Sequence, residues 1–274
     1  KHGIAASIKH FPGDGVDERD QHLVTSINSL DADTWMNTYG KVYQAGIDAG
    51  ALTVMAGYIM QPAWSKKLNP ELKDEDILPG ALSKELLTGL LRGKLGFNGT
   101  IITDSSAMAG LGCAMSRKDA LPKCINAGCD MILLAKNMNE DLGYIRTAIE
   151  NGVISYERFD EAVMRILALK AALKLPQKAA DGTLIPSQGK ADAVVGCPVH
   201  KEISRQVADE SIVLVKEEKG VFPVTPQRYP RILVYPKEGG ETELAFGVES
   251  RTGAVVKRLR DEGFKVDVFK PSKG

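Results

Sequence analysis

The chain has 274 residues, of which 43% are hydrophobic and 26% are charged, so it is long enough for one large domain or two smaller ones. Its 35 basic residues balance 35 acidic ones, which leaves no net charge to attract nucleic acid or an anionic membrane. No apolar run reaches the roughly 18 residues that a membrane helix requires, and residues 1–10 lack the apolar segment of a signal peptide. We therefore expect neither nucleic acid nor a membrane as a partner.

The cysteines are few for a chain of this length, which favours reduced thiols and a cytoplasmic location. A zinc site would have to combine Cys197 and His200 of "CPVH" with Cys124 and Cys129, because thiolates and imidazoles are zinc ligands. The two tight ligand pairs of a structural zinc site are not present. Single buried cysteines are therefore the favoured interpretation, and we expect no metal.

Residues 1–175 repeat one pattern four times: a short β-branched apolar run, a polar loop and a stretch of helical periodicity. The predicted strands are "GIAASIKHF" (3–11), "LTVMAG" (52–57), "GTIITD" (99–104) and "GCDMILLA" (128–135). The predicted helices cover about 35–46, 83–96, 120–127, 139–150 and 155–175. Apolar faces are expected on two of them, formed by Leu86, Leu87, Leu90 and Leu91 and by Phe159, Val163, Ile166 and Leu167. This alternation predicts an α/β fold with a parallel sheet.

Residues 176–198 are rich in glycine, proline and alanine without sustained periodicity, which predicts a linker. Beyond it we expect a helix at 200–210, strands "SIVLVK" (211–216) and "RILVYP" (231–236), a helix near 252–262 and a strand "KVDVF" (265–269). These strands are too few to cover both faces of a sheet. Residues 199–274 are therefore expected to be the start of a second, truncated α/β domain.

Polar side chains follow the predicted strands, and in parallel β/α architectures function gathers at the carboxyl ends of strands. The first strand leads into "KHFPGDGVDERDQH", the second is followed by Tyr58, and the third ends in Asp104. Asp104 either caps the next helix or acts in catalysis, and the pattern leaves both open.

The loop after the first strand contains a carboxylate two residues before an imidazole, Asp20 and His22. Such a pair fixes the tautomer of the imidazole and serves as a general acid and then a general base. The alternative is a charged, solvated loop, which is the commoner meaning of an isolated D-x-H. "PGDG" is by itself a turn and not a phosphate-binding loop.

Two blocks in order, "KHFPGDG" with "DQH" (9–22) and "LGFNGTIITDSSAM" (95–108), resemble glycoside hydrolase family 3, in particular its β-N-acetylglucosaminidase branch. "GCDMILLA" and "SYERFDEAVMRILALK" resemble the last barrel strand and closing helix of that family, and residues 205–224 resemble the opening of its second domain. The resemblance implies that residues 1–175 are the C-terminal half of a (β/α)8 TIM-like barrel. It also implies that residues 199–274 begin a truncated α/β sandwich domain.

The resemblance implies a retaining exo-glycosidase that hydrolyses terminal β-N-acetylglucosaminides through a covalent glycosyl-enzyme. Asp104 matches the nucleophile of the family, His22 its acid/base, and Asp20 the residue that orients the histidine. Lys9 and His10 match residues that hold sugar hydroxyls. No metal or organic cofactor is implied.

The chain departs from the family pattern in two respects. Many members have P-G-H-G where this sequence has Asp14, so we expect Asp14 to contact the substrate and to alter its choice, with Tyr58 as a further sugar contact. The four βα units that precede the K-H-F-P-G strand in the family are not in this sequence. We therefore expect unpaired sheet edges and either a homo-oligomer or association with the missing barrel half.

Other functions stay open at this point. A β-N-acetylglucosaminide phosphorylase is the nearest, because a histidine acid/base repels incoming phosphate less than a carboxylate would. Another β-glycosidase of the same family is also compatible with the motifs. An inactive sugar-binding fragment is the alternative from a different class, because half a barrel keeps its residues but loses the cavity that organises them.

Overall fold

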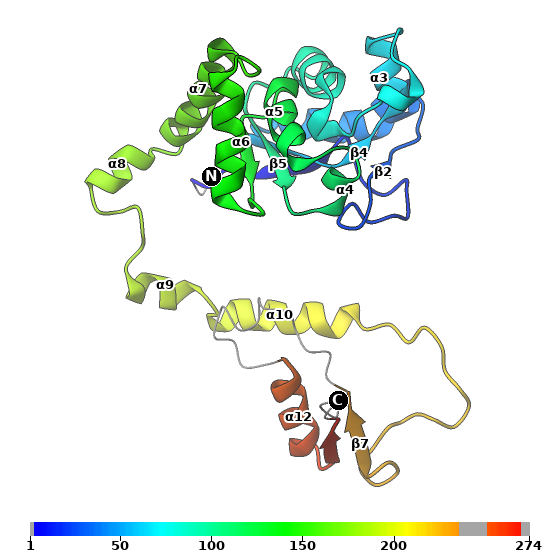
Figure 1. The fold of residues 1–274 in the computed structure, drawn as a ribbon. Coiled ribbons are helices and arrows are strands. Elements are labelled where there is room, and N and C mark those ends of the chain that lie inside the picture. The colour runs from blue at the N-terminus through cyan, green and yellow to red at the C-terminus, as the bar shows by residue number, and fades with distance from the viewer. Residues whose placement is uncertain (1–2, 236–250, 270–274) are drawn as a thin grey trace. The chain divides into compact units, whose positions relative to one another are not determined.

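The computed structural model describes residues 3–235 and 251–269 and divides into two compact units, Lys1–Pro186 and Ser187–Gly274 (Figure 1). The division falls within residues 176–198, where two short helices form, α8 (Leu175–Ala180) and α9 (Gln188–Val194). Across the two described ranges, no helix is both long and apolar enough to cross a membrane.

The first unit is built on a sheet of four parallel strands, which confirms the predicted α/β class. They are β1 (Ser7–Phe11), β3 (Thr53–Ala56), β5 (Thr100–Ser105) and β6 (Met131–Leu133), paired in that order. Val54 aligns with Ile8 on one side and with Ile101 on the other. A small parallel sheet joins β2 (Ser26–Ile27) to β4 (Ile59–Met60). In the described sheet β1 and β6 are the outer strands, and all four carboxyl ends meet at one edge.

Helices connect these strands along the chain (Figure 1). Between β1 and β3 lie α1 (Ala32–Trp35), η1 (Met36–Gly40) and α2 (Lys41–Asp48). Between β4 and β5 lie α3 (Pro62–Leu68), η2 (Asp74–Asp76), η3 (Gly80–Leu82) and η4 (Glu85–Lys94). Then come α4 (Ala109–Gly112), α5 (Arg117–Ala127), α6 (Met138–Glu150) and α7 (Tyr156–Ala172). Helix α5 contacts both α6 and α7.

The core forms where η4 packs on the sheet. Its apolar face is confirmed, because all four predicted leucines, Leu86, Leu87, Leu90 and Leu91, are fully buried. They cluster with Val54 and Ile101. The side chain of Ser83 accepts a hydrogen bond from the N–H of Leu86 at 3.2 Å, so the helix begins where its predicted cap lies. Each large apolar side chain buried in this way stabilises the fold by roughly 1.5–3 kcal/mol.

The predicted inner face of α7 is only partly correct. Phe159 and Leu167 are 39% and 52% exposed, whereas Ala162 is buried. Among the described residues no strand pairs with the outer edge of β6, which is the strand that α7 follows with α6 in the chain. Phe159 and Val163 instead line an open apolar hollow of about 460 Å³ beside Ile132.

An ion cluster holds α7 and η4 at the amino end of the sheet. The carboxylate of Asp130 is fully buried and pairs with Arg92 of η4 at 2.7 Å and with Arg158 of α7 at 2.9 Å. Arg165 lies 3.5 Å away, and the N–H of Ile101 donates to the same carboxylate at 2.9 Å. This cluster is at the end of the sheet opposite to the strand ends that carry the predicted site.

The second unit contains α10 (Pro198–Ser211), β7 (Arg231–Val234), α12 (Arg251–Asp261) and β8 (Lys265–Val268), with β7 and β8 paired in parallel. The strand predicted at 211–216 is wrong, because residues 212–218 have no regular secondary structure. A strand forms only against a neighbour, and Val213 and Val215 are 73% and 92% exposed. Residue 236 of the predicted strand 231–236 lies outside the described residues, as do the other residues of 236–250 and 270–274.

Candidate active site

The turn after β1 is held by three side chains that bind three successive carbonyl oxygens. Trp35 Nε1 donates to the carbonyl of Pro12 at 2.8 Å, Asn28 Nδ2 to that of Gly13 at 3.1 Å, and the Tyr39 hydroxyl to that of Asp14 at 2.6 Å. Trp35 and Asn28 are buried. A Cβ at Gly13, whose φ is +124°, would overlap the Tyr39 ring, so the turn requires glycine there. The backbone that carries Asp14 is therefore fixed by side chains from α1, from η1 and from the loop after β2.

Asp104 lies at the carboxyl end of β5, and its side chain is only 12% exposed. One carboxylate oxygen, Oδ1, accepts a hydrogen bond from the N–H of Ser105 at 2.7 Å. The other, Oδ2, is 3.5 Å from Nε2 of His10. The next helix, α4, has Met108 at its cap position and no side-chain cap bond, so Asp104 does not cap it.

His10 and Asp14 form a linked pair beside the carboxylate of Asp104. Nδ1 of His10 is 2.8 Å from Oδ2 of Asp14, and Gln21 Nε2 donates to Oδ1 of Asp14 at 2.8 Å. An ionised carboxylate only accepts hydrogen bonds, so Nδ1 carries the hydrogen in the His10 contact. The histidine ring is thereby placed between two carboxylates, those of Asp14 and Asp104.

Tyr58 is fully buried, and its contacts are with protein groups. Its hydroxyl donates to the carbonyl oxygens of Asp104 at 2.9 Å and Ser105 at 3.1 Å, and its N–H donates to Gln21 Oε1 at 2.8 Å. Burial raises the pKa of Tyr58 well above its usual value, so the hydroxyl remains a donor. This arrangement favours a role in positioning Asp104 over the predicted sugar contact.

Asp20 and His22 form a separate, exposed pair in the same loop. Asp20 Oδ1 lies 2.7 Å from His22 Nδ1 and 2.9 Å from the His22 backbone nitrogen. These hydrogen bonds, that from the backbone first and that from the ring second, lower the pKa of Asp20. The side chain of His22 is 69% exposed, and among the described residues no hydrogen bond or ion pair joins it to Asp104. Its Nε2 is thus free of protein partners within that part of the chain.

Backbone contacts join the Asp20–His22 segment to the start of α4, the helix that follows β5. The N–H of Ala109 donates to the carbonyl of His22 at 3.2 Å, and the N–H of Gly110 to that of Gln21 at 3.1 Å. A Cβ at Gly110 would lie 2.5 Å from the carbonyl oxygen of Gln21, so only glycine permits this approach. The loop after β1 and the start of α4 therefore face the same strand edge as Asp104.

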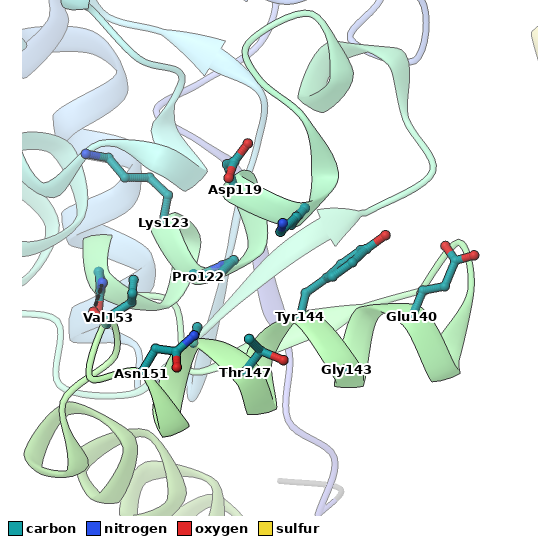
Figure 2. Close-up of a pocket in the computed structure, with 12 residues that line it drawn as sticks. Asp119, Pro122, Lys123, Glu140, Gly143, Tyr144, Thr147, Asn151 and Val153 are labelled. Atoms are coloured by element: carbon teal, nitrogen blue, oxygen red, sulfur yellow. Dashed lines mark hydrogen bonds between the residues drawn. The ribbon is translucent and has the colours of Figure 1, made fainter.

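Lys9 is exposed and lines a hollow of about 480 Å³ together with Asp14 and Tyr39. This hollow lies between β1 and the helical segment η1–α2, next to the strand edge that carries the site. A larger hollow, of about 770 Å³, lies elsewhere, between α5 and α6, and Figure 2 shows Lys123, Tyr144 and Asn151 around it. None of the predicted site residues lines that second hollow. The candidate site is therefore defined by the strand ends and not by the larger opening.

The zinc alternative finds no support in the geometry. Within residues 3–235 and 251–269, no group of three histidine, cysteine, aspartate or glutamate side chains is placed to hold a metal ion. Cys124 and Cys129 are both buried in the first unit. Burial raises the pKa of Cys124 to about 12 and raises that of Cys129 above its usual value, so neither is a ready thiolate.

Comparison with known proteins identifies the family. Residues 1–169 match the model of the glycosyl hydrolase family 3 N-terminal domain. The chain belongs to glycosyl hydrolase family 3. This bears out the resemblance that the K-H-F-P-G and T-D-S blocks carry.

Proteins similar to this chain include a glycosidase and a phosphorylase. A β-N-acetylglucosaminidase/β-glucosidase of Cellulomonas fimi is 52% identical over 275 residues, which cover 99% of this chain and 48% of that protein. The solved structure of a β-glucoside phosphorylase, BglX, with bound 2FGlc is 43% identical, with a TM-score of 0.77, over 99% of this chain and 48% of that one.

A third solved structure is a family 3 β-N-acetylglucosaminidase from Paenibacillus sp. str. FPU-7, 26% identical with a TM-score of 0.70. The match covers 97% of this chain and 48% of that one. The chain thus spans about half the length of these relatives.

Several residues of the candidate site cannot be found from the sequence. Gln21 joins Asp14 to Tyr58, and the side chains of Trp35, Asn28 and Tyr39 hold the turn. The only local signal was that Gln21 stands between Asp20 and His22. The other three lie 15 to 25 positions from the carbonyl groups that they bind, so no spacing rule applies to them.

Proposed function

We propose that this chain carries the catalytic residues of a retaining exo-glycosidase that hydrolyses terminal β-N-acetylglucosaminides, with other β-glucosides as a related substrate class. The observation that carries the proposal is the placement of Asp104. Its nearly buried carboxylate ends a central strand, has one oxygen held by a backbone N–H and does not cap the following helix. The substrate class is supported by the relatives from Cellulomonas fimi and Paenibacillus, which are β-N-acetylglucosaminidases.

In the first step an Asp104 carboxylate oxygen attacks the anomeric carbon while the bond from that carbon to the leaving-group oxygen breaks. The leaving oxygen takes a proton from Nε2 of His22. The Nδ1 contact with Asp20 keeps the other nitrogen of that ring occupied, so Nε2 is the position that exchanges protons. Asp20 thereby orients the histidine and stabilises the ring while it is charged.

In the second step His22 acts as a base. It removes a proton from water, the water oxygen bonds to the anomeric carbon, and the ester bond to Asp104 breaks. In this proposal Lys9 and His10, both near the carboxyl end of β1, bind sugar hydroxyls, and Nε2 of His10 lies 3.5 Å from Asp104. The Tyr58 hydroxyl donates to the backbone carbonyl of Asp104 and so holds that residue in place. No metal or organic cofactor takes part.

Phosphorolysis is the second candidate, because the β-glucoside phosphorylase is 43% identical to this chain. In that reaction phosphate replaces water as the acceptor, and the product is a sugar 1-phosphate. A neutral imidazole leaves the approach of the phosphate anion unopposed, whereas a carboxylate base would repel it. Measuring free sugar and sugar 1-phosphate with and without phosphate separates the two functions.

We also propose that the outer strands β1 and β6 are covered in the active species, either by a further barrel segment or by a second copy of the chain. Unpaired strand edges are prone to association, and apolar side chains such as Leu134 and Met138 are exposed beside β6. Without such a cover the chain would retain its residues but act only as a weak sugar binder.

A mechanism-based inhibitor tests the nucleophile. A 2-deoxy-2-fluoro β-glycoside with an activated leaving group should add one sugar to the chain, or to a longer polypeptide that contains it. Peptide mapping should place that sugar on Asp104, and Asp104→Asn should abolish the labelling. Labelling of another carboxylate would overturn the assignment.

A further inference from the structure

Asp14 is the point at which two side chains from different parts of the site meet. Its Oδ2 accepts from Nδ1 of His10, and its Oδ1 accepts from Nε2 of Gln21, both at 2.8 Å. An ionised carboxylate provides an acceptor for each of these donors. An amide at this position has a single acceptor atom, so it cannot serve both donors where the two carboxylate oxygens now lie, because a nitrogen donor replaces one of those oxygens.

Both contacts of Asp14 lead to Asp104. The ring of His10 continues to Nε2, which lies 3.5 Å from Oδ2 of Asp104. Gln21 continues through its Oε1 to the N–H of Tyr58, and the Tyr58 hydroxyl donates to the carbonyl of Asp104. A shift of Asp14 therefore reaches Asp104 both at its carboxylate and at its backbone.

The backbone beneath Asp14 does not depend on its own side chain. The carbonyl groups of Pro12, Gly13 and Asp14 are held by Trp35, Asn28 and Tyr39 as described above. The side chain of Asp14 is 47% exposed, so its replacement creates no cavity. A substitution at Asp14 therefore changes the two side-chain contacts and leaves the path of the turn in place.

We propose that Asp14 is a positioning residue, whose carboxylate holds the His10 ring toward Asp104 and couples that ring to Gln21 between Asp20 and His22. The catalytic part of this inference rests on the proposed function, because it takes Asp104 as the nucleophile. The contacts themselves do not rest on it. This role replaces the direct sugar contact predicted for Asp14.

The first test reads the ring of His10 without any need for turnover. The chain has four histidines, so ring-labelled [15N]histidine gives few signals, and those of His10 are identified by their loss in His10→Gln. Asp14→Asn should shift the His10 ring signals, because His10 and Gln21 now compete for one acceptor. The signals of His22, held by Asp20, should not move and so report that the loop is folded.

Exchanging the carboxylate of position 14 with the amide of position 21 should restore the hydrogen bond between position 14 and His10. In the double variant Asp14→Asn with Gln21→Glu, the new carboxylate at position 21 accepts from the new amide and from the N–H of Tyr58, which leaves the amide oxygen for His10. The His10 signals should then return toward those of the original chain. Glu18→Gln, an exposed residue of the same loop, makes the same charge change and should leave the signals unmoved.

The second test is kinetic and uses the chain or any longer polypeptide that contains it and turns over. Asp14→Asn should lower kcat on the order of 10- to 100-fold with a smaller change in KM, and the double variant should recover most of that loss. Unmoved His10 signals in Asp14→Asn, or no recovery in the double variant, would overturn the inference. If no form hydrolyses or phosphorolyses a β-glycoside, the proposed function fails, while the ring signals still decide the role of Asp14 as a bridge.

Discussion

Both units of the chain contain parallel strands joined by helices, yet they differ in what they bury. In the first unit, four strands and the helices on them enclose a core that includes Trp35, Leu86 and Leu90. In the described part of the second unit, two strands pair, and Val256 is the one apolar residue that is buried. The same local pattern therefore yields a core only where enough strands provide a surface for helices to cover.

The two units also differ in how their ionisable residues are arranged. The ionisable residues that approach one another at a strand edge, His10, Asp14 and Asp104, belong to the first unit. The charged residues of the second unit form exposed pairs such as Arg231 with Asp267, which contribute little to stability. If this contrast is correct, substitutions in the two units should have very different effects.

The largest difference is expected between two aspartates. Asp104→Ala should lower kcat at least about 1000-fold, because covalent catalysis is lost, in any active polypeptide that contains this chain. Asp267→Ala, in the second unit, should leave kcat within about twofold, since surface changes of this kind are nearly neutral. Steady-state kinetics with an aryl β-glycoside measures both. Equal losses would show that the site is not confined to the first unit.

The next effect separates two roles within the first unit. His22→Ala should slow cleavage of glycosides with poor leaving groups about 100-fold or more, because their oxygen must be protonated as it departs. Activated aryl glycosides should be much less affected in the bond-breaking step. A series of leaving groups of graded acidity gives this dependence. Uniform losses across the series would assign His22 to binding or packing.

The third effect compares a buried leucine with an exposed one. Leu90→Ala should destabilise the first unit by about 2–5 kcal/mol, since Leu90 is fully buried. Leu214→Ala, in the second unit, should change stability by less than about 0.5 kcal/mol. Both tryptophans, Trp35 and Trp64, lie in the first unit, so their fluorescence during denaturant unfolding reports on it. Equal shifts would mean that the second unit is packed more fully than its exposure indicates.

The reactivity of the four cysteine thiols extends the comparison between buried and exposed residues. Cys124 and Cys129 are buried with raised pKa values, whereas Cys113 is exposed and Cys197 is partly exposed. At about pH 8 an aromatic disulfide reagent should modify Cys124 and Cys129 at least about 10-fold more slowly than Cys113. All four should react together in concentrated guanidinium chloride. Rapid native labelling of Cys124 would contradict the closed core.

The smallest expected effect concerns the molecular mass of the chain in solution. Because β1 and β6 have free edges and apolar side chains lie beside β6, the chain by itself should associate, and light scattering should give at least twice its 29.6 kDa. Lysine substitutions at Leu134 and Met138 should return it toward the monomer. A stable monomer with full glycosidase activity would show that the open sheet needs no cover.

What the sequence could predict was local. Strand β5 and Asp104 follow from an apolar run that ends in a carboxylate, and the face of η4 follows from the spacing of its leucines. The strand predicted at 211–216 failed because a β-branched run has no structure of its own without a partner. The link from Asp14 through Gln21 to Tyr58 cannot be predicted from the sequence, because Gln21 and Tyr58 are 37 positions apart and only the folded loop after β1 brings them together.

If the proposed function is correct, the turn at Pro12–Asp14 has a consequence for substrate recognition. Its three carbonyl groups are occupied by Trp35, Asn28 and Tyr39, so the segment loses little conformational entropy when a sugar arrives. A loop that had to become ordered on binding would use part of the interaction energy with each hydroxyl for that purpose. Here that energy is left for discrimination between sugars, and Tyr39→Phe, which removes only the hydroxyl of one anchor, should weaken selectivity before it weakens the fold.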